Sequence, residues 1–180
     1  MNFSCTRHLR LTAIGIVALA AGSLVACSPE PEPTPTPTAA FASEEEAFAA
    51  AEEVYRAYIA AFNEVDLSDP STFEPLSEYT TGRYQSDERE QLSEMHANGN
   101  IRGGEIVVVS FAGTKVLTPD QIKTRTCEDV SETTFTDSAG RNLVPADRAP
   151  RYALDLTFQV TGGDLKLVSS EPVEDPACTG

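Results

Sequence analysis

Few side chains in this sequence are of the kinds that carry out catalysis. His8 lies in a basic N-terminal segment, which leaves His96 as the other histidine of the chain. A general base needs a substrate proton within hydrogen-bond reach, and any Ser-His-Asp or Cys-His set would have to form around His96 alone. His96 sits near the end of a predicted helix, where the negative end of the helix dipole favours a histidine. We therefore predict no catalytic residue.

Four tyrosines are the candidates for lining an internal cavity: Tyr55, Tyr58, Tyr79 and Tyr152. A buried tyrosine is usually a core residue with a satisfied hydroxyl, so cavity lining and core packing are both open for this set. An acid that could act beside them is hard to place, because Asp155 falls on the polar face of its predicted strand. No aspartate is clearly directed inward, which argues against isomerase or dehydratase chemistry in such a cavity.

Metal and phosphate sites lack their usual spacing in the sequence. Asp66, Asp69 and the loop 137–142 carry oxygen ligands that could hold Ca²⁺ weakly, but a helix cap and an Asx-type turn explain the same residues. Gly103-Gly104 precedes a predicted strand rather than a helix, unlike a phosphate-binding loop. We predict no metal site and no cofactor.

The first 26 residues have the features of an export signal. Arg7, His8 and Arg10 form a short basic region, and residues 11–26 are almost wholly apolar or small, without a charge. This stretch is shorter than the roughly 20 apolar residues that span a bilayer comfortably. Residues 1–26 are therefore predicted to be a signal peptide rather than a permanent membrane anchor.

Leu24-Val25-Ala26-Cys27 resembles the lipobox of bacterial lipoproteins. The resemblance implies that the chain is cut before Cys27, that the Cys27 sulfur takes a diacylglyceryl group, and that the membrane is a partner through this anchor. Two acyl chains anchor stably where one would bind reversibly. Residues 28–40, SPEPEPTPTPTAA, cannot bury a core and predict an extended spacer of roughly 40 Å. Residues 27–42 are thus predicted to form a lipidated tether on the outer face of the bacterial cell membrane.

The chain is strongly acidic. It has 13 basic and 28 acidic residues among 180, and Arg7 and Arg10 leave with the predicted signal while no acid does. The processed chain therefore has 11 basic side chains and a formal net charge of −17. Such a surface repels nucleic acid, so we expect no nucleic-acid partner, and it favours solubility.

Two cysteines remain for the displayed domain once Cys5 has left and Cys27 is acylated: Cys127 and Cys178. Outside the cytoplasm, such a pair most simply forms one disulfide. The bond would close a loop of about 50 residues, worth roughly 4 kcal/mol in the chain-entropy account. A metal pair or a reactive thiol is the alternative, for which no further ligands lie nearby in the sequence.

Hydrophobic periodicity predicts three helices in the first half of the domain. The first covers residues 43–64, begins with a capping box, and carries an apolar stripe at spacings of three and four: Phe48, Ala51, Tyr55, Tyr58 and Phe62. Asp69-Pro70 predicts the start of a short second helix that Gly82 ends. A third helix is expected over residues 83–98.

Strand patterns fill the second half. The clearest alternation is 151–160, followed by a Gly162-Gly163 turn and a return strand. The expected strands cover residues 106–111, 116–117 beyond a break at Gly113, 121–130, 132–136, 151–160 and 165–170. Helices first and an antiparallel meander after predict an α+β domain over residues 43–180, with the helices on one face of a curved antiparallel sheet.

This order of elements resembles the NTF2-like, cystatin-related fold, in which a curved sheet wraps a helical layer and leaves a conical cavity. More narrowly, the chain resembles small lipoproteins of actinobacteria without an assigned activity. The residues that carry this resemblance are 58–69 (YIAAFNEVDLSD), 127–131 (CEDVS), Asp137 with Gly140, Asp147-Arg148 and Cys178. It implies a lipid-tethered, disulfide-pinned NTF2-like domain, and it implies no reaction.

These observations favour a non-enzymatic binding or accessory module of the cell envelope, whose partner is an envelope protein or a small ligand. A small-molecule carrier or a lyase- or isomerase-like enzyme using the cavity is the alternative, and a structural envelope protein is a third. An open cavity with an inward acid would favour the second class; a cone filled by side chains would exclude it. Sheet faces in this fold often pair, so a homodimer is among the expected states.

Overall fold

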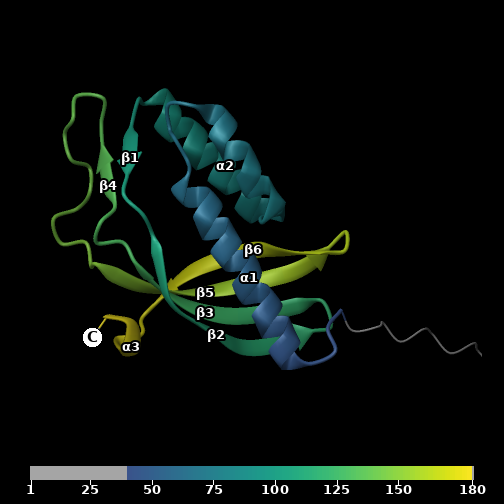
Figure 1. The fold of residues 1–180 in the computed structure, drawn as a ribbon. Coiled ribbons are helices and arrows are strands. Elements are labelled where there is room, and N and C mark those ends of the chain that lie inside the picture. The colour runs from purple at the N-terminus through teal and green to yellow at the C-terminus, as the bar shows by residue number, and fades with distance from the viewer. Residues whose placement is uncertain (1–39, 180) are drawn as a thin grey trace, which may run out of the picture. The chain divides into compact units, whose positions relative to one another are not determined.

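The computed structural model describes residues 40–179, so the predicted signal peptide, Cys27 and most of the tether lie outside the described residues. The elements follow in the order α1 Glu44–Asn63, η1 Pro70–Glu78, α2 Gly82–Ala97, β1 Ile101–Gly103, β2 Val107–Thr118, β3 Gln121–Asp129, β4 Thr134–Thr136, β5 Arg151–Thr161, β6 Asp164–Val173 and α3 Pro176–Thr179 (Figure 1). Among them, no helix is long and apolar enough to cross a bilayer.

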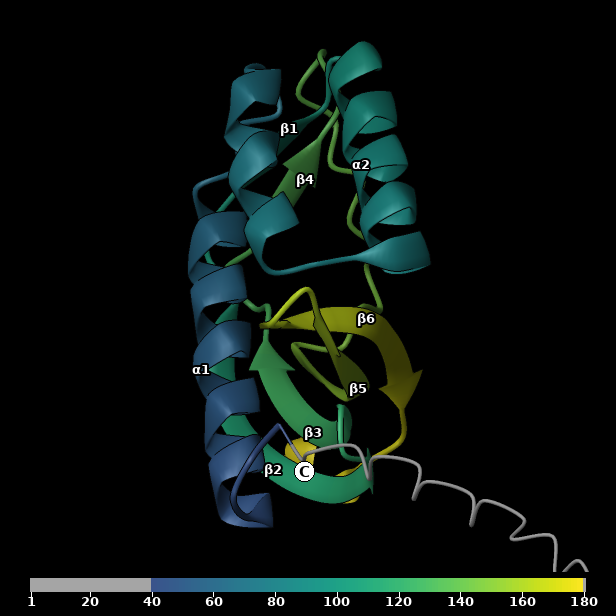
Figure 2. The ribbon, with the colours of Figure 1, turned by 90° about the vertical axis from the view of Figure 1, so that its right-hand side faces the viewer.

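The main sheet is an antiparallel meander with strand order β2-β3-β5-β6. α1 crosses one face of this sheet, and α2 lies next to β6 (Figure 1). β1 and β4 form a separate two-stranded ladder near the end of α2 (Figure 2). The predicted fold class is confirmed: this is an α+β domain with its helices packed on a curved antiparallel sheet.

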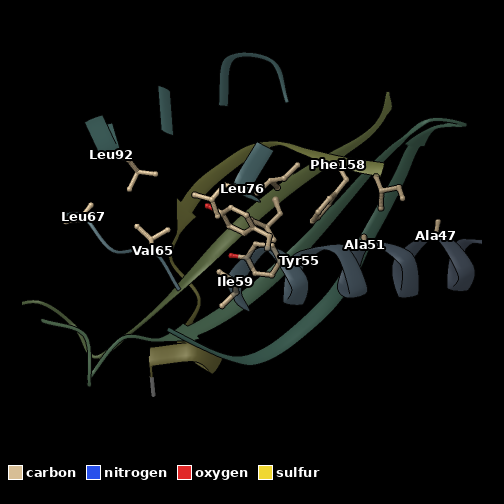
Figure 3. Packing of buried hydrophobic residues seen from close by; sticks show 13 residues of the cluster. Ala47, Ala51, Tyr55, Ile59, Val65, Leu67, Leu76, Leu92 and Phe158 are labelled. Atoms are coloured by element: carbon tan, nitrogen blue, oxygen red, sulfur yellow. The ribbon is translucent and has the colours of Figure 1, made fainter. Parts of the chain in front are cut away.

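α1 is the predicted first helix, and the side chains of Ser43 and Glu46 accept hydrogen bonds at its N-terminus. Ser43 Oγ accepts a hydrogen bond from the N–H of Glu46 at 3.2 Å, and Glu46 Oε2 accepts one from the N–H of Ala42 at 2.8 Å. The buried stripe of α1 faces the sheet and the short helix η1 (Figure 3): Ala47, Ala51, Tyr55, Tyr58 and Ile59. Phe48 and Phe62, which we placed in this stripe, are half-buried at its edges.

The predicted short second helix is present, and it is a 3₁₀ helix. Pro70–Glu78 is a 3₁₀ helix whose first turn is capped by Asp69, which accepts from the N–H of Ser71 at 3.0 Å. Pro75 lies inside it and has no N–H to donate to an α-helical ladder. Gly82, expected to end this helix, instead begins α2, with a φ of 65° that favours glycine.

β2 corrects the predicted break at Gly113. The strand runs unbroken over twelve residues, with irregular register at Val109, Thr114 and Leu117. The glycine is required by packing rather than by a turn: a Cβ there would lie 2.1 Å from Cγ of Phe48. The ring of Phe48 on α1 therefore packs directly on the backbone of β2. The strand β1 was not predicted at all.

The C-terminal segment crosses the outer face of the sheet. Cys127 on β3 and Cys178 on α3 are disulfide-bonded, with Cα atoms 5.5 Å apart. Ala153 of β5, the cross-strand partner of Cys127, is buried beneath this bond. The disulfide therefore covers part of a face that the helices leave open.

Replacing Gly113 by alanine should destabilise the fold by about 1–3 kcal/mol, because the new methyl group overlaps the ring of Phe48. Urea unfolding of the purified full chain measures the change. Gly140→Ala, where a Cβ meets no atom within 4 Å but φ is 79°, measures the separate cost of a left-handed backbone without steric overlap. Adding Phe48→Leu should recover part of the loss in a double-mutant cycle, and an unchanged penalty in that background would contradict the steric cause.

Candidate functional site

A cavity of about 820 Å³ lies between the C-terminal half of α1, the helix α2 and the ends of β3, β5 and β6. The opposite end of the sheet is filled by the apolar core, in which Leu156 and Phe158 are completely buried. Tyr55 separates the two regions: its ring centroid is 5.8 Å from that of Phe111 and 6.4 Å from that of Phe158. The space under the sheet is thus filled at one end and open at the other.

Three of the four tyrosines predicted to line a cavity do line this one: Tyr55, Tyr58 and Tyr152. Tyr79 does not, which corrects that prediction. Its carbonyl oxygen accepts from the N–H of Leu167 at 2.8 Å, so the chain leaves η1 here and is held against β6. As a result Thr80, the next residue, is the fully buried one, and Tyr79 packs half-buried against the core.

The structure places an acid inside the cavity that we did not predict. Glu128 on β3 is only 2% exposed and lines the cavity. It belongs to the inward-facing set of β3, in which every second residue is buried: Ile122, Thr124, Thr126 and Glu128. A signal for this was present in the sequence, because the alternate positions Lys123, Arg125 and Asp129 are charged and belong on the solvent face.

The Tyr55 hydroxyl hydrogen-bonds to the Glu128 carboxyl. It donates to Oε1 from α1, 73 residues away in sequence. Tyr152 is the cross-strand neighbour of Glu128 on β5, and its hydroxyl lies near the same carboxyl. Burial raises the pKa of the Glu128 carboxyl, and the two tyrosine hydroxyls oppose this rise. Burial and the nearby carboxyl also raise the pKa values of Tyr55 and Tyr152, so both hydroxyls stay protonated.

A second acid from α2 faces the same cavity. Glu88 Oε1 accepts from the Tyr58 hydroxyl at 2.5 Å, and the Thr80 hydroxyl lies 3.4 Å from Oε2. The Tyr58 and Tyr84 hydroxyl oxygens are 3.1 Å apart. Burial raises the pKa of the half-buried Glu88 carboxyl and raises the pKa of Tyr84 to about 12. Two partly or fully buried carboxyls, each held by tyrosine hydroxyls, therefore share one hollow.

Two arginines also line the cavity, and both are hydrogen-bonded to neighbouring parts of the chain. Arg148 donates three hydrogen bonds of 2.7–3.1 Å to the backbone oxygens of Val130 and Thr133 and to the Thr133 hydroxyl. Arg102 bonds to the carbonyl and side-chain oxygens of Asn63, and its guanidinium lies 4.8 Å from the ring centroid of Phe62. Across residues 40–179, none of the ion pairs includes Glu88 or Glu128.

Other residues considered from the sequence have local roles. His96 is exposed, and its Nδ1 lies 2.7 Å from the carbonyl oxygen of Leu67. Asp155 lies on the outer face, as expected, and binds Arg125 Nε at 2.7 Å. Asp66 and Asp137 accept bonds within their own turns. Within residues 40–179, no group of three or more histidine, cysteine or acidic side chains is arranged to hold a metal ion.

Comparison with known proteins supports the fold and assigns no activity. No family model matches the sequence, and neither does any curated protein. The intermembrane-space region of the chloroplast protein ARC6 is similar in structure, with a TM-score of 0.51 at 13% identity over 71% of this chain and 97% of that one. At this identity, the likeness shows a shared fold and nothing about activity.

Two other similar structures carry descriptions of the predicted fold type. One is a provisionally assigned dehydratase of the NTF2-like family from Streptomyces avermitilis, at 11% identity and a TM-score of 0.43, covering 74% of this chain and 100% of that one. The other is a protein of unknown function with a cystatin-like fold from Nostoc punctiforme, at 11% identity and a TM-score of 0.41, covering 75% and 95%. Neither description transfers an activity to this chain.

The burial of Glu128 predicts a pH dependence of stability. Because its pKa is raised in the folded state, the folded chain holds this proton to higher pH than the unfolded chain, where a glutamate titrates near about 4.3. Wild-type stability should therefore fall relative to Glu128→Gln as the pH rises from about 4.3 through the folded pKa. Urea unfolding of both full chains across this range measures the difference.

Asp155→Asn is the matched control, and its sign is opposite. Hydrogen bonding to Arg125 lowers the pKa of Asp155 in the folded state, so wild-type stability should be lost relative to Asp155→Asn as the pH falls below about 3.9. Parallel curves for wild type and Glu128→Gln would contradict the burial of an acid in the cavity.

Proposed function

We propose that this chain is a lipid-anchored binding module of the cell envelope that takes up a small molecule in the cavity between α1, α2 and the sheet. The observation that supports it most is the open volume beside two inward carboxyls. A cavity of about 820 Å³ falls within the range of small-molecule sites, which combine apolar walls with a few placed polar groups. Here aromatic walls surround Glu88 and Glu128.

Glu128 also favours a second candidate, an enzyme of the lyase or isomerase kind. A buried acid with a raised pKa, close to tyrosine hydroxyls, is a group that can exchange a proton with a bound molecule. Incubating a bound ligand with the protein and analysing it by mass spectrometry and NMR separates the two candidates, because an isomerisation changes the structure without changing the mass. An unchanged mass and structure supports the binding module, and a chemical change that Glu128→Gln abolishes supports the enzyme.

Filling the cavity should abolish ligand uptake. Ser170 on β6 lines the cavity and is the cross-strand neighbour of Leu156 on β5. Ser169 is the cross-strand neighbour of Thr157 and lies on the other face of the sheet. In a thermal-shift screen of metabolites with the full chain, ligands should raise the Tm of wild type and of Ser169→Trp. The same ligands should leave the Tm of Ser170→Trp unchanged. Hits that Ser170→Trp still binds, or a broad screen without a hit, would argue against the proposal.

The anchor has a separate test. When the full chain is expressed in a bacterial host with a clickable palmitate analogue, we expect the label on the wild-type protein and none on Cys27→Ser, because the thioether needs the Cys27 sulfur. The wild-type protein should fractionate with membranes and the variant should not. Cys5→Ser, in the predicted signal, is the matched control and should keep the label. Equal labelling of wild type and Cys27→Ser would remove the lipid anchor from the proposal.

A further inference from the structure

The two carboxyls of the cavity keep free hydrogen-bond acceptor capacity. The hydroxyl proton of Tyr55 is used by Glu128, and that of Tyr58 is used by Glu88. A hydroxyl that donates its one proton keeps its lone pairs, and a carboxylate has about four acceptor positions in all. The acceptor capacity left on these oxygens is therefore available to a ligand that brings its own N–H or O–H groups.

Neither Glu88 nor Glu128 has an ion-pair partner among residues 40–179. A carboxylate as buried as Glu128 is costly unless it is paired or protonated. The guanidiniums of two arginines line the same cavity, but Arg148 is bound to the 130–133 turn, and Arg102 to Asn63 and Phe62. A cation from outside the chain would form a direct ion pair with this carboxylate.

The walls suit an organic cation better than a bare metal ion. Aromatic rings from four elements line the space: Tyr55, Tyr58, Phe62, Tyr84, Phe135 and Tyr152. The faces of such rings attract cations, and their area packs against an apolar body. A divalent metal requires several oxygen ligands around one point, and residues 40–179 contain no such group of side chains.

We propose that the ligand of this cavity is an organic amine, a protonated nitrogen on an aromatic or branched apolar body, with its ammonium group bound at Glu128. This rests on the proposed function, since it names the class of molecule that the cavity takes. The ammonium N–H groups meet the free lone pairs of the carboxylate and its tyrosines, and the body lies among the rings. An anion of the same shape would be repelled by the carboxylates of Glu88 and Glu128, so we expect it to bind most weakly.

Three probes of similar shape and different charge test this on the full chain by isothermal titration calorimetry: phenethylamine, 2-phenylethanol and 3-phenylpropanoate. We expect wild type to bind the amine about tenfold more tightly than the alcohol, since charge-assisted hydrogen bonds are roughly twice as strong as neutral ones. The carboxylate should bind most weakly. This order is read on wild type alone and does not depend on whether any variant folds.

Variants then locate the charge that sets the preference. Glu128→Gln should bind the amine and the alcohol equally, Glu128→Asp should keep part of the preference, and Asp155→Asn on the outer face should keep all of it. Preference for the alcohol or the carboxylate in wild type, or an amine preference that survives Glu128→Gln, would overturn the inference while leaving small-molecule uptake intact. Binding of none of the three would overturn it too, and the metabolite screen with Ser170→Trp then decides separately whether the cavity takes any ligand.

Discussion

The hydrogen bond from Tyr55 to Glu128 joins the helical layer to the sheet at the boundary between core and cavity. The ring and the hydroxyl of Tyr55 have different environments. The Tyr55 ring packs edge-on against Phe158 in the apolar core, while its hydroxyl reaches the acid at the open end. The Tyr55 side chain thus fixes the position of α1 along its axis over the sheet. If the helix moved by one turn, the Tyr55 hydroxyl would be buried in the core without a partner and Glu128 would lose its hydrogen-bond donor. The cavity exists at this place because α1 is held there.

β3 shows how a single strand builds both regions. Its inward side chains change from apolar to acidic along the strand, and the neighbours across on β5 change with them. Ile122 faces Phe158 at one end, and Glu128 faces Tyr152 at the other. The outward neighbour of Glu128 is Cys127, whose disulfide holds α3 against the back of the same strand. The segment that carries the cavity acid is therefore fixed from the helix side by Tyr55 and from the outer side by the disulfide.

The sequence predicted the parts of this structure that depend on local periodicity, and failed where a polar side chain points inward. The stripe of α1 and the alternation of β5 are set by burial of apolar residues, so both could be predicted. Thr124, Thr126 and Glu128 are polar at inward positions, and the face of β3 could be assigned only from the charges at its other positions. β4 falls within the predicted strand 132–136, but its partner β1 has three residues and pairs with it across more than thirty residues, so the ladder has no local signal. The exit of the chain at Tyr79 likewise depends on tertiary contacts with β6.

Burying an acid in this place is hard to explain by stability alone. A glutamine or an apolar residue at position 128 could keep the strand in register, and replacing buried charge by well-packed neutral groups is often neutral or stabilising. The Tyr55 hydrogen bond does not require the charge either, because a neutral oxygen also accepts from the Tyr55 hydroxyl. Departures from the most stable choice tend to gather where a protein binds or reacts. Glu128 is such a departure, and it lines a cavity of about 820 Å³ among aromatic rings that favour a cation. Its destabilising burial is accounted for if the stabilising partner is a ligand that the folded chain binds and the unfolded chain does not.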